Sequence, residues 1–195
     1  AGLSYVVTRP GGRSYEGVDA TGLSTTVSFA GNSRTTVADF VWKWAPEGNA
    51  RERHFKLQGE YFRRTEDGRL SCAERDTSGA CGGAAGLADS YRSAQTGYYL
   101  QGVYQFMPNW RIGYRHDRLD SGTPSFGPTL VAADLPQLAS WKPTRNTLMV
   151  DYATSEFARL RFQMARDTSR GSSPADNQYW LQYVMSLGAH GAHKF

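Results

Sequence analysis

The apolar residues of this chain recur at every second position over several segments. In residues 36–44, Phe40, Trp42 and Trp44 share one parity, while the other parity is mixed and includes Asp39. A period of two is that of a β-strand whose two faces meet different environments. The same alternation recurs over residues 53–63, 94–106, 110–116, 145–152 and 157–166. We therefore predict an all-β protein.

The end of the chain carries a further strand of this kind, and it stops on an aromatic residue. Residues 181–195 read LQYVMSLGAHGAHKF, in which Leu181, Tyr183, Met185 and Phe195 share one parity. This pattern resembles the closing strand of bacterial outer-membrane β-barrels. The resemblance implies an antiparallel up-and-down transmembrane β-barrel of about eight strands, in the outer membrane of a Gram-negative bacterium. It also implies the partners, which are the lipid bilayer, lipopolysaccharide and the barrel-assembly machinery that would recognise the last strand and Phe195.

Alternation alone does not separate this barrel from a soluble β-sandwich, but the connections favour the barrel. Residues 46–50, 107–109 and 154–156 form short connections, whereas residues 64–91, 119–144 and 167–176 are longer and polar. Outer-membrane barrels alternate short periplasmic turns with longer external loops. A Greek-key sandwich has no reason to keep that order.

The aromatic residues agree with two membrane interfaces. Trp42, Trp44 and Trp110 lie beside the short connections, while Tyr61 and Tyr98 lie toward the long ones. Amphipathic rings gather at both membrane–water interfaces of a barrel. The ordinary alternative is a set of core aromatic residues at strand ends.

The strand count depends on the first part of the chain. Counting back from the C-terminus gives seven strands that begin near residues 34, 52, 92, 110, 145, 157 and 177. A strand at residues 3–8, followed by a long loop, gives eight, and a single barrel domain over residues 1–195 with residues 1–33 left open. Alternatively, residues 23–29 pair with the next strand through a turn at residues 30–33, and the chain is the C-terminal part of a larger barrel.

Composition narrows the class of protein further. Hydrophobic residues make up 39% of the chain and aromatic residues 13%, and no run of 18 apolar residues occurs, which excludes a transmembrane helix by sequence. The net charge of +4 comes from scattered residues, so we expect no nucleic-acid partner. The first residue is Ala1, as expected either for an exported protein after signal cleavage or for an internal fragment.

The two cysteines fall in one polar, glycine-rich segment. Cys72 and Cys81 lie in SCAERDTSGAC, which favours a local loop disulfide in an oxidising compartment over two free thiols. A metal site there would need further ligands, and the segment contains no histidine.

The sequence shows no catalytic motif, and we expect neither enzymatic activity nor a cofactor. It contains no G-x-S-x-G, H-E-x-x-H or phosphate-binding G-x-x-x-x-G-K. His190 and His193 would point to opposite faces of a strand, so a shared metal site is not expected. The ending GAHGAHKF resembles uncharacterised outer-membrane proteins associated with zinc-limited growth, which leaves His190 as the one candidate metal ligand.

Charged residues on the polar strand faces are the main functional lead. A charge facing hydrocarbon is costly, so these side chains must be paired or hydrated inside the barrel. The candidate lumen-lining residues are Lys43, Lys56, Glu60, Arg111, Arg115, Asp151, Arg159 and Arg161. The arginines could form a basic ladder that favours anions, or an internal network of salt bridges that fills a narrow lumen.

We therefore expect a porin-like protein that passes small solutes or ions through a charged lumen. The alternative is a closed small barrel with a structural role, or a role in surface interaction through its outer loops. A barrel enzyme acting on lipid and a secreted soluble β-protein are two further alternatives.

Overall fold

The computed structural model describes residues 1–18, 22, 24–73, 88–130, 132, 135–155, 157–171 and 174–186. Within them the chain is all-β, as predicted. The strands are β1 (Gly2–Thr8), β2 (Arg13–Val18), β3 (Ser24–Trp44), β4 (His54–Ala73), β5 (Ala88–Met107), β6 (Trp110–Asp120), β7 (Ser125–Phe126), β8 (Thr144–Ala153), β9 (Ala158–Asp167) and β10 (Asp176–Met185). Two short 3₁₀ helices, η1 (Pro46–Gly48) and η4 (Pro136–Leu138), lie in connections. The predicted continuation of the last strand to Phe195 lies outside the described residues.

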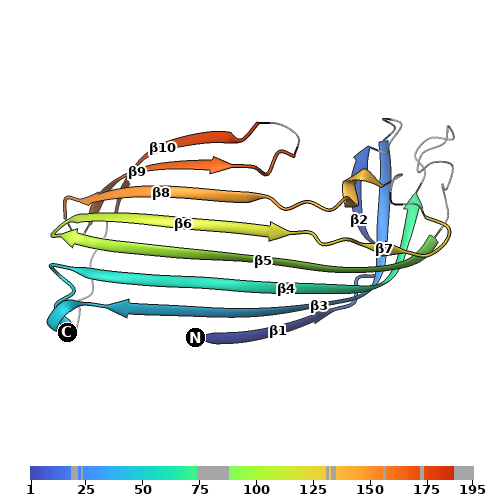
Figure 1. The fold of residues 1–195 in the computed structure, drawn as a ribbon, viewed down its shortest axis with the longest axis horizontal. Coiled ribbons are helices and arrows are strands. Elements are labelled where there is room, and N and C mark those ends of the chain that lie inside the picture. Colours follow the sequence, from blue (N-terminus) through green and yellow to red (C-terminus); the bar gives the residue numbers. More distant parts are fainter. Residues whose placement is uncertain are drawn as a thin grey trace. The chain divides into compact units, whose positions relative to one another are not determined.

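The strands form one sheet in which most strands pair with the long strand that follows them in sequence. The hydrogen-bonded order is β1-β3-β4-β5-β6-β8-β9-β10, with β2 added to β3 and β7 added to β5 (Figure 1). The pairs β1–β3, β2–β3, β8–β9 and β9–β10 are antiparallel. The eight strands of this path are the eight that the sequence predicts. β1 and β10 are the two ends of the order, so the sheet is not closed within the described residues, and the barrel stays a prediction.

β1 and β2 lie along successive parts of β3. Thr8 pairs with Ser33, and Arg13 pairs with Phe29. Between these two segments the chain passes Pro10, whose carbonyl accepts a hydrogen bond from Gly31 at 3.1 Å. Residues 9–33 were predicted as a loop, and that prediction is wrong for β2 and for the first half of β3.

The alternative turn at residues 30–33 is also wrong, because these residues continue β3. Gly31 serves a different purpose from a turn glycine. A Cβ atom on Gly31 would lie 2.6 Å from the Cα atom of Gly68 and 2.5 Å from the carbonyl oxygen of Asp67. The two glycines therefore permit a close approach of the β3 and β4 backbones, which is a common reason for glycine inside a strand.

β4 and β5 extend into the segment predicted as the longest loop. β4 continues through residues 64–73 and β5 begins at Ala88. Polar side chains lie on both faces of this segment, such as those of Arg64 and Arg69. They remove the alternation of apolar and polar residues from which a strand would have been predicted. The alternation of faces along β4 nevertheless continues, because the even-numbered residues Glu66, Leu70 and Cys72 are all buried.

Two connections on one side of the meander are tight, whereas the third, from β3 to β4, spans residues 45–53 and contains η1. Pro108 and Asn109 alone join β5 to β6, and residues 154–157 join β8 to β9. Asn109 has a φ of 70°, a left-handed conformation that asparagine tolerates better than most residues. The connections from β4 to β5 and from β6 to β8 are the longest, as the sequence predicts.

The chain divides into two compact units. The first unit comprises residues 1–39, 60–98 and 118–142, and the second unit comprises residues 40–59, 99–117 and 143–195. The boundaries fall inside β3, β4, β5 and β6, so these strands contribute to both units. Whether the chain is one domain stays a prediction.

The first unit contains an apolar core of the kind found in soluble proteins. The core consists of Val27, Phe29, Leu70, Cys72, Tyr91, Leu130 and Leu135. The Phe29 and Tyr91 rings meet edge to face, with centroids 5.5 Å apart. Asp89 fixes the long connection over this core, because its Oδ2 accepts hydrogen bonds from the backbone N–H groups of Thr129 at 2.6 Å and Leu130 at 3.1 Å.

Replacing Leu70, which is fully buried, tests this core. We expect Leu70→Ala to lower the free energy of unfolding by about 2–5 kcal/mol, because it leaves a cavity. Leu70→Met, which conserves volume, should cost less than about 1.5 kcal/mol. Urea-induced unfolding in detergent micelles measures both, and equal effects of the two variants would contradict the assignment of this core.

Candidate functional site

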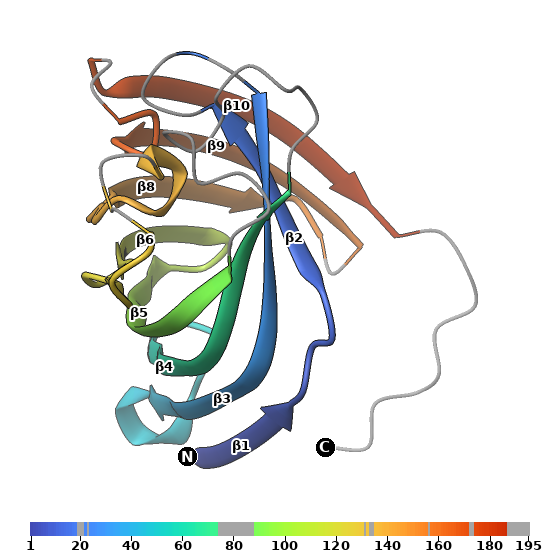
Figure 2. The same cartoon turned by 90° about the vertical axis from the view of Figure 1, so that its right-hand side faces the viewer.

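The strands of the second unit have an apolar face whose large side chains are exposed. In β9 the exposed residues include Leu160, Phe162 and Met164. Each lies directly opposite an exposed apolar residue of β10: Leu160 opposite Tyr183, Phe162 opposite Leu181, and Met164 opposite Tyr179. β8, β9 and β10 run side by side (Figure 2). The exposed residues therefore form continuous cross-strand pairs rather than isolated contacts.

The same exposure recurs on the other strand segments of the second unit. Exposed apolar residues there include Phe40, Trp42, Trp44, Leu100, Tyr104, Ile112, Tyr114 and Leu148. We call these residues, together with those of β9 and β10, the apolar face. Soluble monomers rarely leave large contiguous apolar patches in contact with water, so this face is suited to an apolar environment.

Aromatic rings of the second unit meet where strands enter the short connections. The Trp42 and Phe55 rings lie 5.9 Å apart, near the end of β3 and the start of β4. The Trp110 and Tyr152 rings lie 4.7 Å apart, near the start of β6 and the end of β8. The sequence predicts an aromatic belt at this end of the strands.

The opposite face of the second unit, which we call the polar face, carries a buried carboxylate at its centre. Asp151 of β8 lies directly opposite Arg161 of β9, and its side chain is 1% exposed. Arg161 Nε donates to Asp151 Oδ1 at 2.6 Å, and Nη2 donates to Oδ2 at 2.9 Å. Arg159 Nη1 lies farther away, 3.9 Å from Asp151 Oδ2. Arg161 thus makes the bidentate pair, which is the strongest arrangement of these groups.

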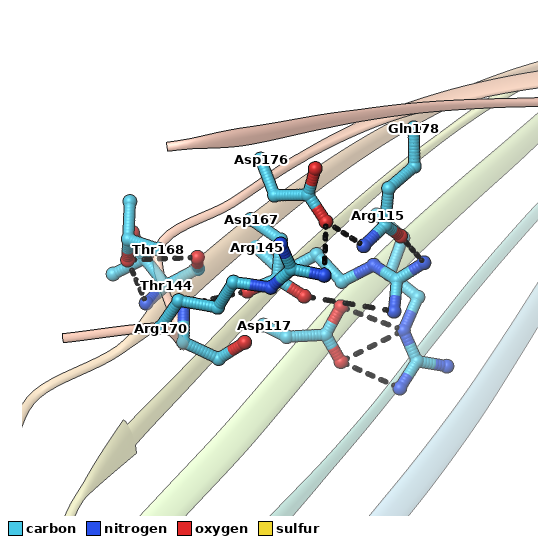
Figure 3. A network of polar contacts seen from close by, with 10 residues as sticks. Arg115, Asp117, Thr144, Arg145, Asp167, Thr168, Arg170, Asp176 and Gln178 are labelled. Carbon is cyan, nitrogen blue, oxygen red and sulfur yellow. Dashed lines mark hydrogen bonds and ion pairs between the residues drawn. The ribbon is translucent and has the colours of Figure 1, made fainter. Parts of the chain in front are cut away.

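A second network of polar contacts lies on the polar face where β8 begins, β9 ends and β10 begins, near Thr144, Asp167 and Asp176 (Figure 3). Arg115 Nη2 donates to Asp117 Oδ1 at 2.6 Å, and its guanidinium lies 3.9 Å from the centre of the Tyr99 ring. Arg145 Nη2 donates to Gln178 Oε1 at 3.2 Å, and Nη1 lies 3.9 Å from Asp167 Oδ2. These arginines are therefore partly neutralised by nearby carboxylates.

Among the described residues, the cavities that open on the polar face include two that lie beside most of its charged side chains. A cavity of about 360 Å³ is lined by residues that include Arg115, Arg145 and Arg161, and one of about 180 Å³ by residues that include Lys56 and Arg161. Met149 borders both cavities. Its methyl group occupies the space beside Gly113, where an added Cβ atom would lie only 2.8 Å away.

Six of the eight predicted lumen-lining residues line these two cavities, and two do not. The six are Lys56, Arg111, Arg115, Asp151, Arg159 and Arg161. Lys43 is exposed near the end of β3, and Glu60 is half-buried in the first unit. The prediction selected charged residues and so missed the neutral lining residues Gln58, Gln101, Thr147 and Gln163. These neutral residues lie on the same faces of their strands as the charged ones, and this shared parity could have identified them.

The first unit holds a buried ion-pair cluster that sequence reasoning missed. Both Arg13 of β2 and Arg64 of β4 donate to Oε1 of Glu66, whose side chain is 1% exposed. Burial alone would raise the pKa of Glu66, but the hydrogen bonds from the two arginines outweigh it and lower that pKa below its ordinary value. Residues 64–91 were predicted as a loop, so Glu66 was not considered. The even-numbered residues from Lys56 to Cys72 would lie on one face of a single long strand, and this pattern could have revealed Glu66 as a buried residue.

The remaining predicted sites are not resolved by the described residues. Cys72 is buried, and its Sγ lies 3.1 Å from the hydroxyl oxygen of Thr25. Cys81 and His190 lie outside the described residues, so the disulfide and the histidine ligand stay predictions. Within the described ranges, no three side chains of His, Cys, Asp or Glu gather as a metal site. Nor does that part of the chain contain a helix long and apolar enough to cross a membrane.

Comparison with known proteins yields one distant relative. The chain is 23% identical over 174 residues to an uncharacterized protein of Aquifex aeolicus (strain VF5). The match covers 86% of this chain and 32% of the relative, so the chain spans about a third of that protein's length. No protein-family description matches the chain. No solved structure matches it either.

The Glu66 cluster predicts a pH-dependent contribution to stability. Because its pKa is lowered in the folded state, Glu66 stabilises the protein above its unfolded pKa of about 4.3. That contribution is lost as the pH falls through the lower folded-state pKa. We expect Glu66→Gln to lower the free energy of unfolding by about 1.5–3 kcal/mol at pH 7. The difference from the unmodified protein should disappear at low pH.

The neighbouring pair provides a matched control. Asp67 accepts from Arg92 Nε at 2.7 Å, but both side chains are largely exposed. Asp67→Asn should therefore cost no more than about 1 kcal/mol. A stability difference for Glu66→Gln that is unchanged from pH 7 to pH 3 would show that the carboxylate does not act through its charge.

Proposed function

We propose that this chain forms an integral outer-membrane β-barrel with a porin-like lumen. The observation that carries the proposal is the reversed polarity of the second unit. Its large apolar residues are exposed, with Leu181 75% and Phe162 48% accessible, while Asp151 is buried on the other face. A water-soluble sheet protein would bury the apolar face and expose the charges. A transmembrane barrel turns apolar side chains to lipid and polar side chains inward.

Strand length supports the same proposal. A transmembrane β-strand needs about 9–11 residues, and β8, β9 and β10 have 10 residues each. β3, β4 and β5 have 21, 20 and 20 residues, about twice that requirement. We propose that their second-unit segments cross the bilayer and that their first-unit segments, which bury an apolar core, extend into water.

The proposed localisation and partners follow from the apolar face. It would contact the lipid bilayer and lipopolysaccharide, and the barrel-assembly machinery would insert the chain through its C-terminal strand and Phe195. Inside the barrel, the two cavities of the polar face would provide the path for small solutes or ions. No covalent chemistry and no cofactor are needed for this function.

A closed barrel with a structural or surface-interaction role is the second candidate. The ion pairs Arg161–Asp151 and Arg115–Asp117 favour it, because paired side chains fill the interior of a small barrel. The folded core of the first unit also gives such a barrel a defined external structure through which it could interact.

A charge placed on the apolar face tests the membrane assignment. We expect Phe162→Arg to lower the free energy of unfolding from phospholipid vesicles by about 2–4 kcal/mol, because an arginine near the bilayer midplane is poorly solvated. Phe162→Leu, which keeps the site apolar, should lose less than half of that. Unfolding by urea from vesicles measures the difference.

The soluble alternative makes the opposite prediction for the same variant. On a water-exposed surface, arginine would leave stability within about 0.5 kcal/mol and improve solubility. A Phe162→Arg protein that is fully stable and monodisperse in buffer without detergent would exclude the proposed function.

Conductance separates the porin from the closed barrel. We expect the refolded chain to produce discrete conductance steps in a planar bilayer, and the heat-denatured protein to produce none. Heat-modifiable gel mobility confirms that the barrel has folded before each recording. Folded and inserted protein that never conducts would overturn the porin function and favour the closed barrel.

A further inference from the structure

We infer that the polar face of the second unit holds a binding site for a small oxyanion, formed by Lys56, Arg111 and Arg159. The inference builds on the proposed function, because it names the class of solute that the lumen would select. It rests on the smaller cavity of the polar face and on the pairing of the charges around it.

The charges around this cavity do not balance. Four cationic side chains line it, namely Lys56, Arg111, Arg159 and Arg161, with one carboxylate, that of Asp151. Four positive charges against one negative charge leave an excess of three, not counting His54, which also lines the cavity. The neutral lining residues, which include Gln58 and Gln101, supply no further negative charge.

The one carboxylate accepts its hydrogen bonds from a single arginine, and Arg159 Nη1 lies only within ion-pair range, 3.9 Å from its Oδ2. Both of its oxygens accept hydrogen bonds from Arg161 at 2.6 and 2.9 Å. The Nε atoms of Arg111 and Arg159 are buried and have no hydrogen-bond partner among the described residues. A buried N–H donor without an acceptor is unfavourable, so the Nε–H groups of these two arginines lack the acceptor that an anion would provide.

The larger cavity differs from the smaller one in this respect. Its arginines all donate hydrogen bonds to other side chains: Arg115 to Asp117, Arg145 to Gln178, and Arg161 to Asp151. The basic ladder expected from the sequence is thus neutralised over part of its length. Lys56, Arg111 and Arg159 are the cations of the two cavities that donate no hydrogen bond to another described side chain.

An oxyanion fits these groups better than other ligands do. A planar guanidinium matches the geometry of carboxylate and phosphate oxygens, and an ammonium group adds a strong point charge. The cavity volume of about 180 Å³ admits an ion of the size of phosphate. A cation would be repelled by the excess positive charge, and the apolar side chains of Val103 and Met149 offer too little surface for an apolar ligand.

Isothermal titration of the folded chain with inorganic phosphate in detergent micelles tests the site. We expect saturable binding to the unmodified protein. Arg111→Gln and Lys56→Gln should each weaken it at least about tenfold, as the loss of one charge-assisted hydrogen bond implies. The matched control is Arg166→Gln, which removes one positive charge from an exposed side chain of the same sheet and should change the affinity less than about twofold. Heat-modifiable mobility and circular dichroism verify that each variant is folded.

The outcomes distinguish the failure of this inference from the failure of the proposed function. Non-saturable binding, or equal losses for Arg111→Gln and Arg166→Gln, would overturn the anion site whether or not the protein conducts. Saturable binding lost only in Arg111→Gln and Lys56→Gln would support the site even in a barrel that shows no conductance. If Arg111→Gln fails to fold, Arg111→Lys, which keeps the charge but loses the planar fork, should fold and bind with intermediate affinity. Unchanged affinity in a folded Arg111→Lys would exclude a role for the guanidinium Nε.

Discussion

The structure depends on the environment of the apolar face of the second unit. Side chains such as Phe162 and Leu181 cannot be left in water without a large hydrophobic cost, yet no protein segment among the described residues buries them. A bilayer would remove that cost, and it would also require every backbone N–H and C=O group to be paired within the sheet. An antiparallel meander meets this requirement between its inner strands, whereas its edges β1 and β10 would meet it only by pairing with each other. The proposed environment would make charges acceptable on one face only, which is where Asp151 and Arg161 pair.

In the proposed barrel the long strands would lie in two environments, and the aromatic residues of β3 show a matching change of parity. The buried apolar residues of the first unit are Val27 and Phe29, at odd positions. The exposed aromatic residues of the second unit are Phe40, Trp42 and Trp44, at even positions, and Val41 between them is exposed as well. Such a change is what one continuous strand would need if it passed from water into lipid, as the proposed function requires.

The change of parity also explains which parts of the fold could be predicted from the sequence. The eight strands of the main path were predictable, because in segments such as residues 157–166 apolar and charged residues alternate with high contrast. β2 and the outer half of β4 were not, because Arg64, Glu66 and Arg69 place charges on both faces. The alternative strand count placed Gly31 in a turn, since sequence alone does not distinguish a turn from the close approach of two backbones.

The parity of residues along the strands also decided how much of the candidate site could be predicted. Parity alone identified Lys56, Arg111, Arg115, Asp151, Arg159 and Arg161 as residues of one face, and the structure brings them to two neighbouring cavities. Their pairing could not be predicted, because it depends on register. Asp151 lies opposite Arg161 rather than Arg159, and a shift of the register would have changed which arginine remains without a partner.

The most direct measurement of the central claim is a nitroxide scan along β9 in phospholipid vesicles, with Cys72 and Cys81 replaced by serine. Single labels at residues 159–164 are tested for collisions with oxygen, which partitions into lipid, and with a water-soluble nickel chelate. The account predicts a period of two, with labels at residues 160, 162 and 164 accessible to oxygen and shielded from nickel. Labels at residues 159, 161 and 163 should show the opposite. Uniform nickel accessibility at the even positions would contradict it.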